Sequence, residues 1–145
     1  MPNKTAKYLI IGGGIIGCSV AYHLAKNGQK DIVLLEKSNL TEGATWHAAG
    51  LVGQLRSSRN TTRMLQKSVA MYDRLADEVG AEFDWKKVGS LRLASTKERL
   101  LEAKRLKTMA RSFNLHMDII SASEAKKLFP YIDDKGLEGA AFIPS

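Results

Sequence analysis

The chain has 145 residues, a net charge of +7, 44% hydrophobic residues and a single cysteine, Cys18. This length supports one hydrophobic core, the lone cysteine excludes an internal disulfide and fits a reducing compartment, and no apolar run approaches the roughly 18 residues of a transmembrane helix. The basic residues are interleaved with acidic ones, and the densest group, 97–111, has apolar residues on the other side of a helical pattern. A solvated helix face therefore explains the charge better than a nucleic-acid partner does. With no signal-peptide or presequence pattern at its start, we expect a cytoplasmic protein that binds neither membranes nor nucleic acid.

Residues 8–35 predict a strand, a helix and a second strand. Tyr8–Ile11 is a short apolar run that glycines end, which is typical of a buried strand. Residues 15–27 have helical spacing, and Gly28 is placed to end that helix. The run over 32–35 is apolar and rich in β-branched residues, as in a second buried strand. Together these segments predict a right-handed parallel β-α-β unit.

The rest of the chain predicts longer helices, a hairpin and a last strand. Two capping-box sequences, Ser95 to Glu98 and Ser121 to Glu124, predict helix starts. In chain order the expected elements are a loop over 38–60, a helix over 61–79, a hairpin over 83–94 that turns at Val88-Gly89, a helix over 97–113, a loop that contains His116, a short helix ended by Pro130, and a strand over 137–143.

The predicted fold class is α/β. A doubly wound nucleotide-binding sheet needs at least one more parallel strand and helices on both faces, and we find no third βα unit after Leu35. We therefore expect the N-terminal β-α-β of a Rossmann-like domain plus part of an inserted α+β region, an incomplete domain from a larger protein. Residues 1–60 would belong to the nucleotide-binding domain, and 61–145 would lead into a truncated substrate or cap region.

The glycine-rich turn after the first strand predicts dinucleotide binding. Gly12, Gly14 and Gly17 fit the G-x-G-x-x-G pattern, in which the glycines permit the tight turn, the approach of the pyrophosphate and close helix packing. The phosphates would lie over the helix N-terminus. Glu36, 19 residues beyond Gly17, is placed to accept hydrogen bonds from the adenosine ribose. An acid there disfavours the 2′-phosphate of NADP and leaves NAD and FAD open; a ligand-free turn and a surface carboxylate are the alternative interpretations.

A second segment, Gly43–Gly50, places one tryptophan and one histidine among six small residues. Small side chains let the backbone run against a flat or extended ligand. This makes His47 a candidate for direct contact with the cofactor, although composition alone allows a surface or core histidine equally well.

Three segments, Gly12–Gly17, Leu34–Lys37 and Gly43–Leu51, together resemble the N-terminal part of the FAD-dependent amine oxidoreductases of the D-amino-acid oxidase superfamily. Within that superfamily, the Thr-Trp-His-Ala-Ala-Gly element resembles the dimethylglycine and sarcosine dehydrogenases. Further similar stretches at 89–94, 123–125 and 128–130 extend the resemblance over essentially the whole chain.

The resemblance implies FAD as the cofactor and assigns its contacts. It makes His47 the residue joined covalently to the 8α-methyl group of the flavin; an unlinked contact is the alternative. Ile15 and Ile16 would contact the phosphates, and Glu36 and Lys37 would hold the adenosine end. The flavin side would be lined by Gly43, Ala44, Thr45, Trp46, His47, Ala48, Ala49, Gly50 and Leu51.

The reaction that the resemblance implies is oxidative demethylation of an N-methyl amine such as dimethylglycine or sarcosine, with hydride passing to flavin N5. Tetrahydrofolate as an acceptor and an electron-transfer flavoprotein as a partner are implied for some members. We assign no catalytic residue and no metal site, and expect the 145 residues alone to be inactive. An FAD oxidase for another amine or amino acid, and a non-catalytic nucleotide-binding module, stay as alternatives.

Overall fold

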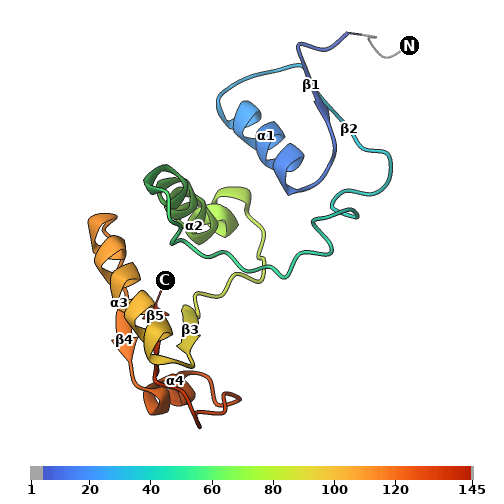
Figure 1. Cartoon of the computed structure of the whole chain (residues 1–145). Helices are drawn as coiled ribbons and strands as arrows, with labels where there is room; N and C mark the ends of the chain where they lie inside the picture. Colours follow the sequence, from blue (N-terminus) through green and yellow to red (C-terminus); the bar gives the residue numbers. More distant parts are fainter. Residues whose placement is uncertain (1–4, 145) are drawn as a thin grey trace. The chain divides into compact units, whose positions relative to one another are not determined.

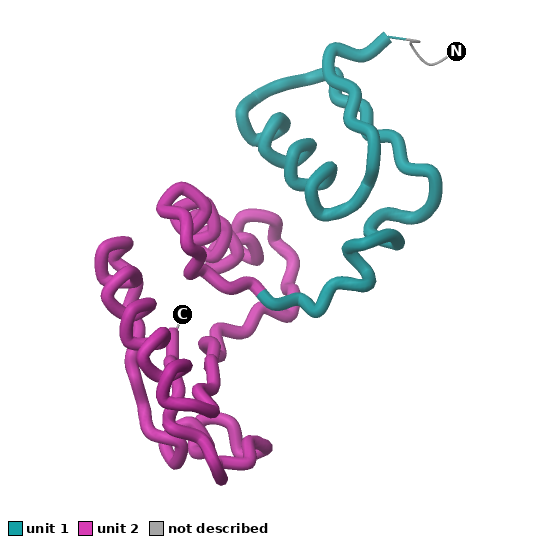
Figure 2. The backbone as a smooth tube through the Cα atoms, viewed as in Figure 1, with its two compact units in different colours: residues 1–51 teal, residues 52–145 magenta. Residues whose placement is uncertain are grey.

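The computed structural model describes residues 5–144 (Figure 1). The chain divides into two compact units, residues 1–51 and 52–145 (Figure 2).

Unit 1 is the predicted parallel β-α-β unit. Its elements are β1 (Tyr8–Ile11), α1 (Ile15–Lys26) and β2 (Ile32–Leu35). The two strands pair in parallel, with Tyr8 opposite Ile32 and Ile11 opposite Leu35, and α1 contacts both of them. The predicted α/β class is confirmed, and with two parallel strands the unit is a partial nucleotide-binding domain.

Alternate residues of β1 and β2 differ sharply in exposure. Leu9, Ile11, Val33 and Leu35 are between 38% and 82% exposed, and the register places Leu9 beside Val33 and Ile11 beside Leu35. Because side chains alternate across a strand, these four share one face of the sheet, while the half-buried residues between them turn toward α1. The sheet of unit 1 thus has one covered and one open apolar face.

Unit 2 is an α+β arrangement. Its helices are α2 (Arg59–Val79), α3 (Lys97–Ser112) and α4 (Ala122–Leu128), and its strands are β3 (Ser90–Ala94), β4 (Asp118–Ile120) and β5 (Gly139–Ile143). The strands form an antiparallel sheet in the order β3-β5-β4. The core lies between α3 and this sheet, where Ala103, Ala110, Met117 and Ala141 are buried.

The predicted hairpin over 83–94 is wrong. Only Ser90–Ala94 forms a strand, and its partner is β5 rather than the residues before Gly89. The aromatic residues of the missing strand pack on α2 instead: Trp85 stacks on Tyr72 with ring centroids 5.0 Å apart and donates from Nε1 to Asp73 at 2.9 Å. The alternation of apolar and polar residues predicts a strand, but its pairing partner depends on tertiary contacts.

The capping predictions have opposite outcomes. Ser121 and Glu124 form the predicted capping box of α4. The other prediction, Ser95 with Glu98, is wrong, because the N-cap of α3 is Thr96, whose hydroxyl accepts the Arg99 N–H at 3.3 Å.

The starts of one helix and one strand differ from the prediction by two residues, and one strand was not predicted. Helix α2 begins two residues early because Ser58 caps it, and β5 begins at Gly139 rather than at residue 137. The expected loop around His116 leads into β4, a strand that the sequence analysis missed, because three residues carry too little alternation to reveal one.

Candidate functional site

The glycine turn of unit 1 is closed by backbone geometry that only glycine allows. Gly12 has φ +105° and donates its N–H to the Leu35 carbonyl at 2.8 Å. A Cβ on Gly17 would lie 1.8 Å from the Gly12 carbonyl oxygen, far inside any real contact. Gly17 therefore sets how closely α1 can approach the end of β1, as the nucleotide-binding pattern requires.

Gly14 is the N-cap of α1 and supplies no side-chain acceptor. A Cβ at this position would meet only the Thr45 hydroxyl, at 3.1 Å. The first N–H groups of a helix have no partner within the helix and, with the macrodipole, favour a phosphate group. Ile15 and Ile16 begin this first turn, and Ile16 is 78% exposed. These residues fit a pyrophosphate.

Glu36 stands where β2 ends and turns its carboxylate onto the glycine turn. It accepts the N–H of Gly13 at 2.6 Å and the N–H of Ser38 at 3.1 Å. These two hydrogen bonds, the one from Gly13 first, lower the pKa of the Glu36 carboxyl from its ordinary value. The group is therefore ionised at neutral pH, and its remaining lone pairs are free to accept ribose hydroxyl groups.

The segment after β2 returns to the same turn. Thr41 donates its N–H to the Gly13 carbonyl at 2.9 Å, and the hydroxyl of Thr45 accepts the Ile15 N–H at 2.9 Å. The predicted phosphate turn and the predicted flavin-lining segment are thus in direct contact, although 30 residues separate the last pair along the chain.

His47 lies two residues beyond that contact, on the surface of unit 1. Its Nδ1 is 3.0 Å from the Gly43 carbonyl oxygen. A carbonyl only accepts, so Nδ1 carries the hydrogen, and in the neutral ring Nε2 is the nitrogen with the free lone pair. The neighbouring Trp46 is 78% exposed and Leu51 is 90% exposed, which makes their apolar surfaces available to a flat ligand.

The structure gathers most, not all, of the predicted site residues. The glycine turn, Glu36 and Thr45 meet through the contacts above, whereas Lys37 and the small residues Ala44, Ala48, Ala49 and Gly50 lie exposed along the same loops. Two further residues of this network, Gly13 and Thr41, escaped the sequence analysis. Gly13 sits in the variable second place of the glycine pattern, and no sequence signal marks Thr41.

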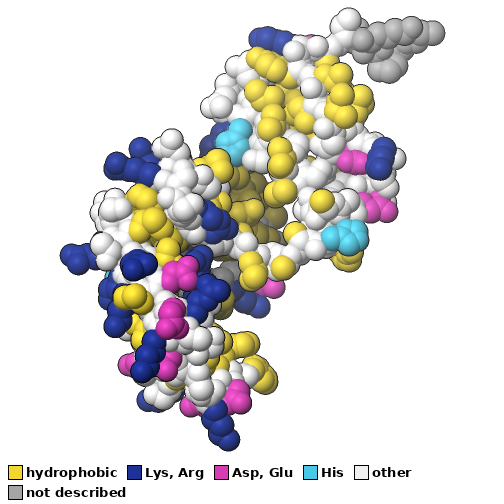
Figure 3. All heavy atoms as spheres, viewed as in Figure 1, with side chains coloured by type: hydrophobic (Ala, Val, Ile, Leu, Met, Phe, Trp, Pro, Cys, Tyr) yellow, Lys and Arg dark blue, Asp and Glu magenta, His cyan; other side chains and the backbone are white. Residues whose placement is uncertain are grey.

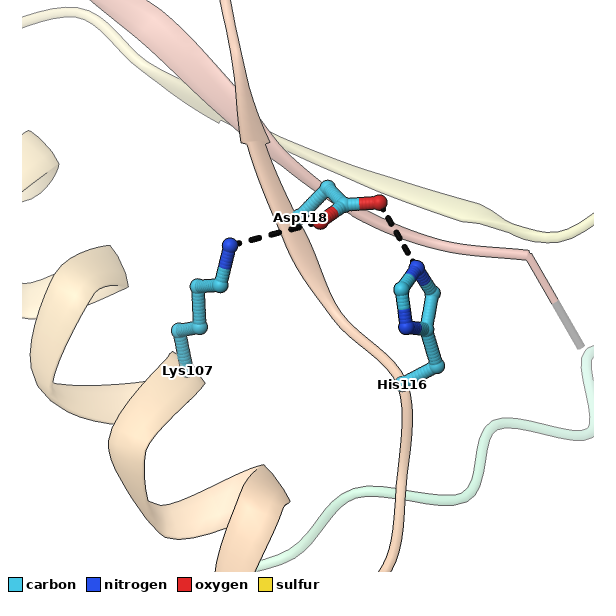
Figure 4. A network of polar contacts seen from close by, with 3 residues as sticks. All are labelled: Lys107, His116 and Asp118. Atoms are coloured by element: carbon cyan, nitrogen blue, oxygen red, sulfur yellow. Dashed lines mark hydrogen bonds and ion pairs between the residues drawn. The ribbon is translucent and has the colours of Figure 1, made fainter.

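Unit 2 carries a polar network between α3 and β4. Asp118 accepts from His116 Nε2 at 2.8 Å and from Lys107 Nζ at 3.3 Å (Figure 4). The hydrogen bond from His116, and then that from Lys107, lower the pKa of the Asp118 carboxyl. All three side chains are substantially exposed, so this is a surface network.

Charge and composition give no other site. Within residues 5–144, no cluster of His, Cys, Asp or Glu side chains is arranged to hold a metal ion, and none of the helices there is long and apolar enough for a membrane span. On the face shown in Figure 3, the lysines and arginines of unit 2 are dispersed among acidic residues, while hydrophobic side chains gather on unit 1. The positive charge forms no continuous patch there.

A parallel β-α-β unit with a glycine turn and an acid after its second strand defines the class of dinucleotide-binding proteins. Within that class, the family described as FAD dependent oxidoreductase, DAO, matches residues 7–145. The chain belongs to this family, as the resemblance predicts.

Individual relatives are similar over nearly the whole chain. Human mitochondrial sarcosine dehydrogenase is 39% identical over 97% of the chain, rat mitochondrial dimethylglycine dehydrogenase 44% over 92%, and the mouse mitochondrial pyruvate dehydrogenase phosphatase regulatory subunit 37% over 96%. The chain spans only 16% of the length of each. Among solved structures, the crystal structure of L-proline dehydrogenase from P. horikoshii is similar, with a TM-score of 0.90 and 28% sequence identity. The match covers 99% of the present chain and 37% of the proline dehydrogenase chain.

Proposed function

We propose that this chain is the N-terminal FAD-binding segment of a flavoenzyme that oxidatively demethylates N-methyl amines such as dimethylglycine or sarcosine. Relatives named for sarcosine and dimethylglycine support the substrate class. The observation that carries the proposal is the contact of Thr45 with Ile15, because it ties the segment around His47 to the turn that suits a pyrophosphate.

Each part of the site would hold one part of FAD. The first turn of α1 would bind the pyrophosphate through the N–H groups that follow Ile15, whose own N–H is bonded to Thr45, with Gly14 giving it room. Glu36 would accept the adenosine ribose hydroxyl groups and Lys37 would lie beside them, and the segment 43–51 would line the flavin. Bound in this way, FAD supplies the hydride acceptor, N5, for oxidation of the N-methyl carbon.

His47 would be the covalent attachment residue, through its 8α link to the flavin ring. Its exposed ring and the lone pair on Nε2, left free by the Nδ1 hydrogen bond to Gly43, suit a nucleophile. Reoxidation by an electron-transfer flavoprotein and transfer of the one-carbon unit to tetrahydrofolate would involve parts of the protein beyond these residues. A cytoplasmic location stays a prediction; the three curated relatives above are mitochondrial by name.

Acid denaturation of the whole protein that contains this chain tests the cofactor assignment. We expect yellow flavin to stay with the precipitated protein, and to be released from His47→Ala. His23→Ala is the matched control, since His23 is exposed and also hydrogen-bonds through Nδ1 to a carbonyl four residues earlier, at 2.8 Å from Ser19. Complete release of flavin from the unmodified protein would contradict the covalent assignment, and a preparation without FAD would contradict the whole proposal.

Anaerobic mixing with substrates tests the activity. Dimethylglycine or sarcosine should bleach the flavin absorbance, with formaldehyde as a product. The similarity to a phosphatase regulatory subunit favours one alternative, a flavin-binding module without turnover. Bound FAD that no amine reduces would support that alternative.

A further inference from the structure

We infer that Thr45 is a positioning residue that aligns His47 for covalent attachment of the flavin, through its hydrogen bond to the start of α1. This inference rests on the proposed function, because it concerns the bond proposed between His47 and FAD. Beyond that bond, it assigns to the Thr45 hydroxyl the role of speeding its formation.

The first observation is that Thr45 satisfies an unpaired N–H group at the start of α1. Gly14 occupies the N-cap position and offers no side chain. The Thr45 hydroxyl accepts the Ile15 N–H at 2.9 Å from another part of the chain. Ile15 is the first residue of α1, and its N–H is one of the orphan donors at the helix start, so this bond anchors a loop to a regular element.

A second contact holds the other end of the same loop. Thr41 donates its N–H to the Gly13 carbonyl at 2.9 Å, and its backbone has φ +66°. A β-branched residue is rare in this left-handed region because its side chain crowds the backbone. A conformation of this cost persists only where surrounding contacts hold it, which marks the loop as fixed rather than free.

The loop passes this anchoring on to His47. The Trp46 N–H donates to the carbonyls of Thr41 and Gly43, at 3.0 and 3.1 Å. The imidazole of His47 is in turn oriented by the same Gly43 carbonyl, at 3.0 Å. The path from the turn that suits the phosphates to the imidazole therefore runs through one compact set of turns, and the side chain of Thr45 ties these turns to α1.

Attachment joins an imidazole nitrogen of His47 to the 8α carbon of the flavin. The carbon gives up one hydrogen and the imidazole gives up its N–H hydrogen; both, with two electrons, pass to the isoalloxazine ring. Molecular oxygen then removes them as hydrogen peroxide, which restores the oxidised cofactor. Because the imidazole nitrogen must reach the 8α carbon in bonding geometry, attachment is faster when the ring is held near its target.

The test compares Thr45→Val with Thr45→Ser in the whole protein that contains this chain. Apoprotein is mixed with FAD in air, and the covalent fraction is followed by in-gel flavin fluorescence after acid denaturation, while total flavin is measured by absorbance. Measured at FAD concentrations that saturate each variant, loss of one hydrogen bond should slow attachment in Thr45→Val about fivefold, and Thr45→Ser should react like the parent. Thr108→Val is the control, since it removes an exposed threonine hydroxyl that also bonds to backbone, at 3.3 Å from the Lys104 carbonyl.

The outcomes separate the inference from the proposal beneath it. Parent-like attachment in Thr45→Val, with covalent flavin in the parent, overturns the inference alone. A Thr45→Val protein whose attachment rate returns to that of the parent at saturating FAD also overturns it, because Thr45 would then only hold the cofactor and not align the histidine. Complete acid release of flavin from the parent overturns the covalent assignment to His47 and the inference with it.

Discussion

Gly17→Ala gives the sharpest prediction for stability. Helix propensity predicts that the substitution stabilises the protein, whereas packing predicts that it destabilises it. In a helix interior alanine is favoured over glycine by about 1 kcal/mol. Here, however, the new Cβ would lie 1.8 Å from the Gly12 carbonyl oxygen and 3.0 Å from its carbonyl carbon. Both atoms are backbone, so no rotamer change relieves the clash.

The size of the effect follows from those distances. Since real Cβ contacts essentially never fall below 3.0 Å, the 1.8 Å approach requires roughly 1.2 Å of separation between α1 and the end of β1. Overpacking costs about 1–3 kcal/mol, and a backbone clash belongs at the upper end, so the net loss should be about 2 kcal/mol after the propensity gain. The displaced turn should also lose FAD.

Urea denaturation of the apoprotein and FAD titration would measure both effects. Gly53→Ala is the control: its Cβ would lie 3.6 Å from an Arg56 side-chain nitrogen, an ordinary contact, so stability and binding should stay close to those of the parent. A Gly17→Ala protein as stable as the parent, or more so, would refute the close packing of α1 on the turn.

Three further changes have signs fixed by the structure. Ser121→Ala removes the hydroxyl that accepts the Glu124 N–H at 3.2 Å, so urea denaturation should show a loss of about 1 kcal/mol, against almost none for the mid-helix control Ser68→Ala. Asp118→Asn removes the carboxylate of Figure 4, whose folded pKa lies below its ordinary 3.8. The ionised Asp118 carboxylate stabilises the folded state fully above pH 3.8, and this stabilisation is lost as the pH falls through the folded pKa. The small difference in stability between Asp118→Asn and the parent should therefore vanish in strong acid. A difference that persists there would contradict the pairing with His116 and Lys107. Glu36→Gln should show the same direction of pH dependence, because the pKa of Glu36 is also lowered, from an ordinary value of 4.5. The urea unfolding midpoints of the variant and the parent should converge as the pH falls below 4.5. Midpoints that stay equally far apart at all pH values would contradict the hydrogen bond of Glu36 to the glycine turn.

The sequence predicts best where a pattern is local and complete. The β-α-β unit and its glycine turn were predictable because strand, helix and turn each have a periodicity or a residue requirement within about thirty residues. The capping box at Ser121 succeeded because both of its members lie in one turn of helix. At Ser95 the same pattern was wrong by one position, because Thr96 next to it caps equally well.

The prediction fails where a strand must choose a distant partner. Residues 83–94 alternate well enough for two strands, but pairing depends on what else reaches the sheet. Gly89 bends the chain with φ +75°, Trp85 packs on α2, and β5, some fifty residues further along, takes the place beside β3. Nothing within the segment itself encodes that exchange.

By itself, the sequence determined that a glycine turn follows a buried strand, that an acid ends the next strand, and that a histidine follows among small residues. Only the tertiary structure decided how these features meet: Glu36 accepts the Gly13 N–H, and Thr45 accepts the N–H of Ile15, the first residue of α1. The physical reason is that glycine patterns and strand periodicity are properties of neighbouring residues, whereas a loop finds its hydrogen-bond partners only after the strands and helix have fixed where the unpaired N–H groups lie.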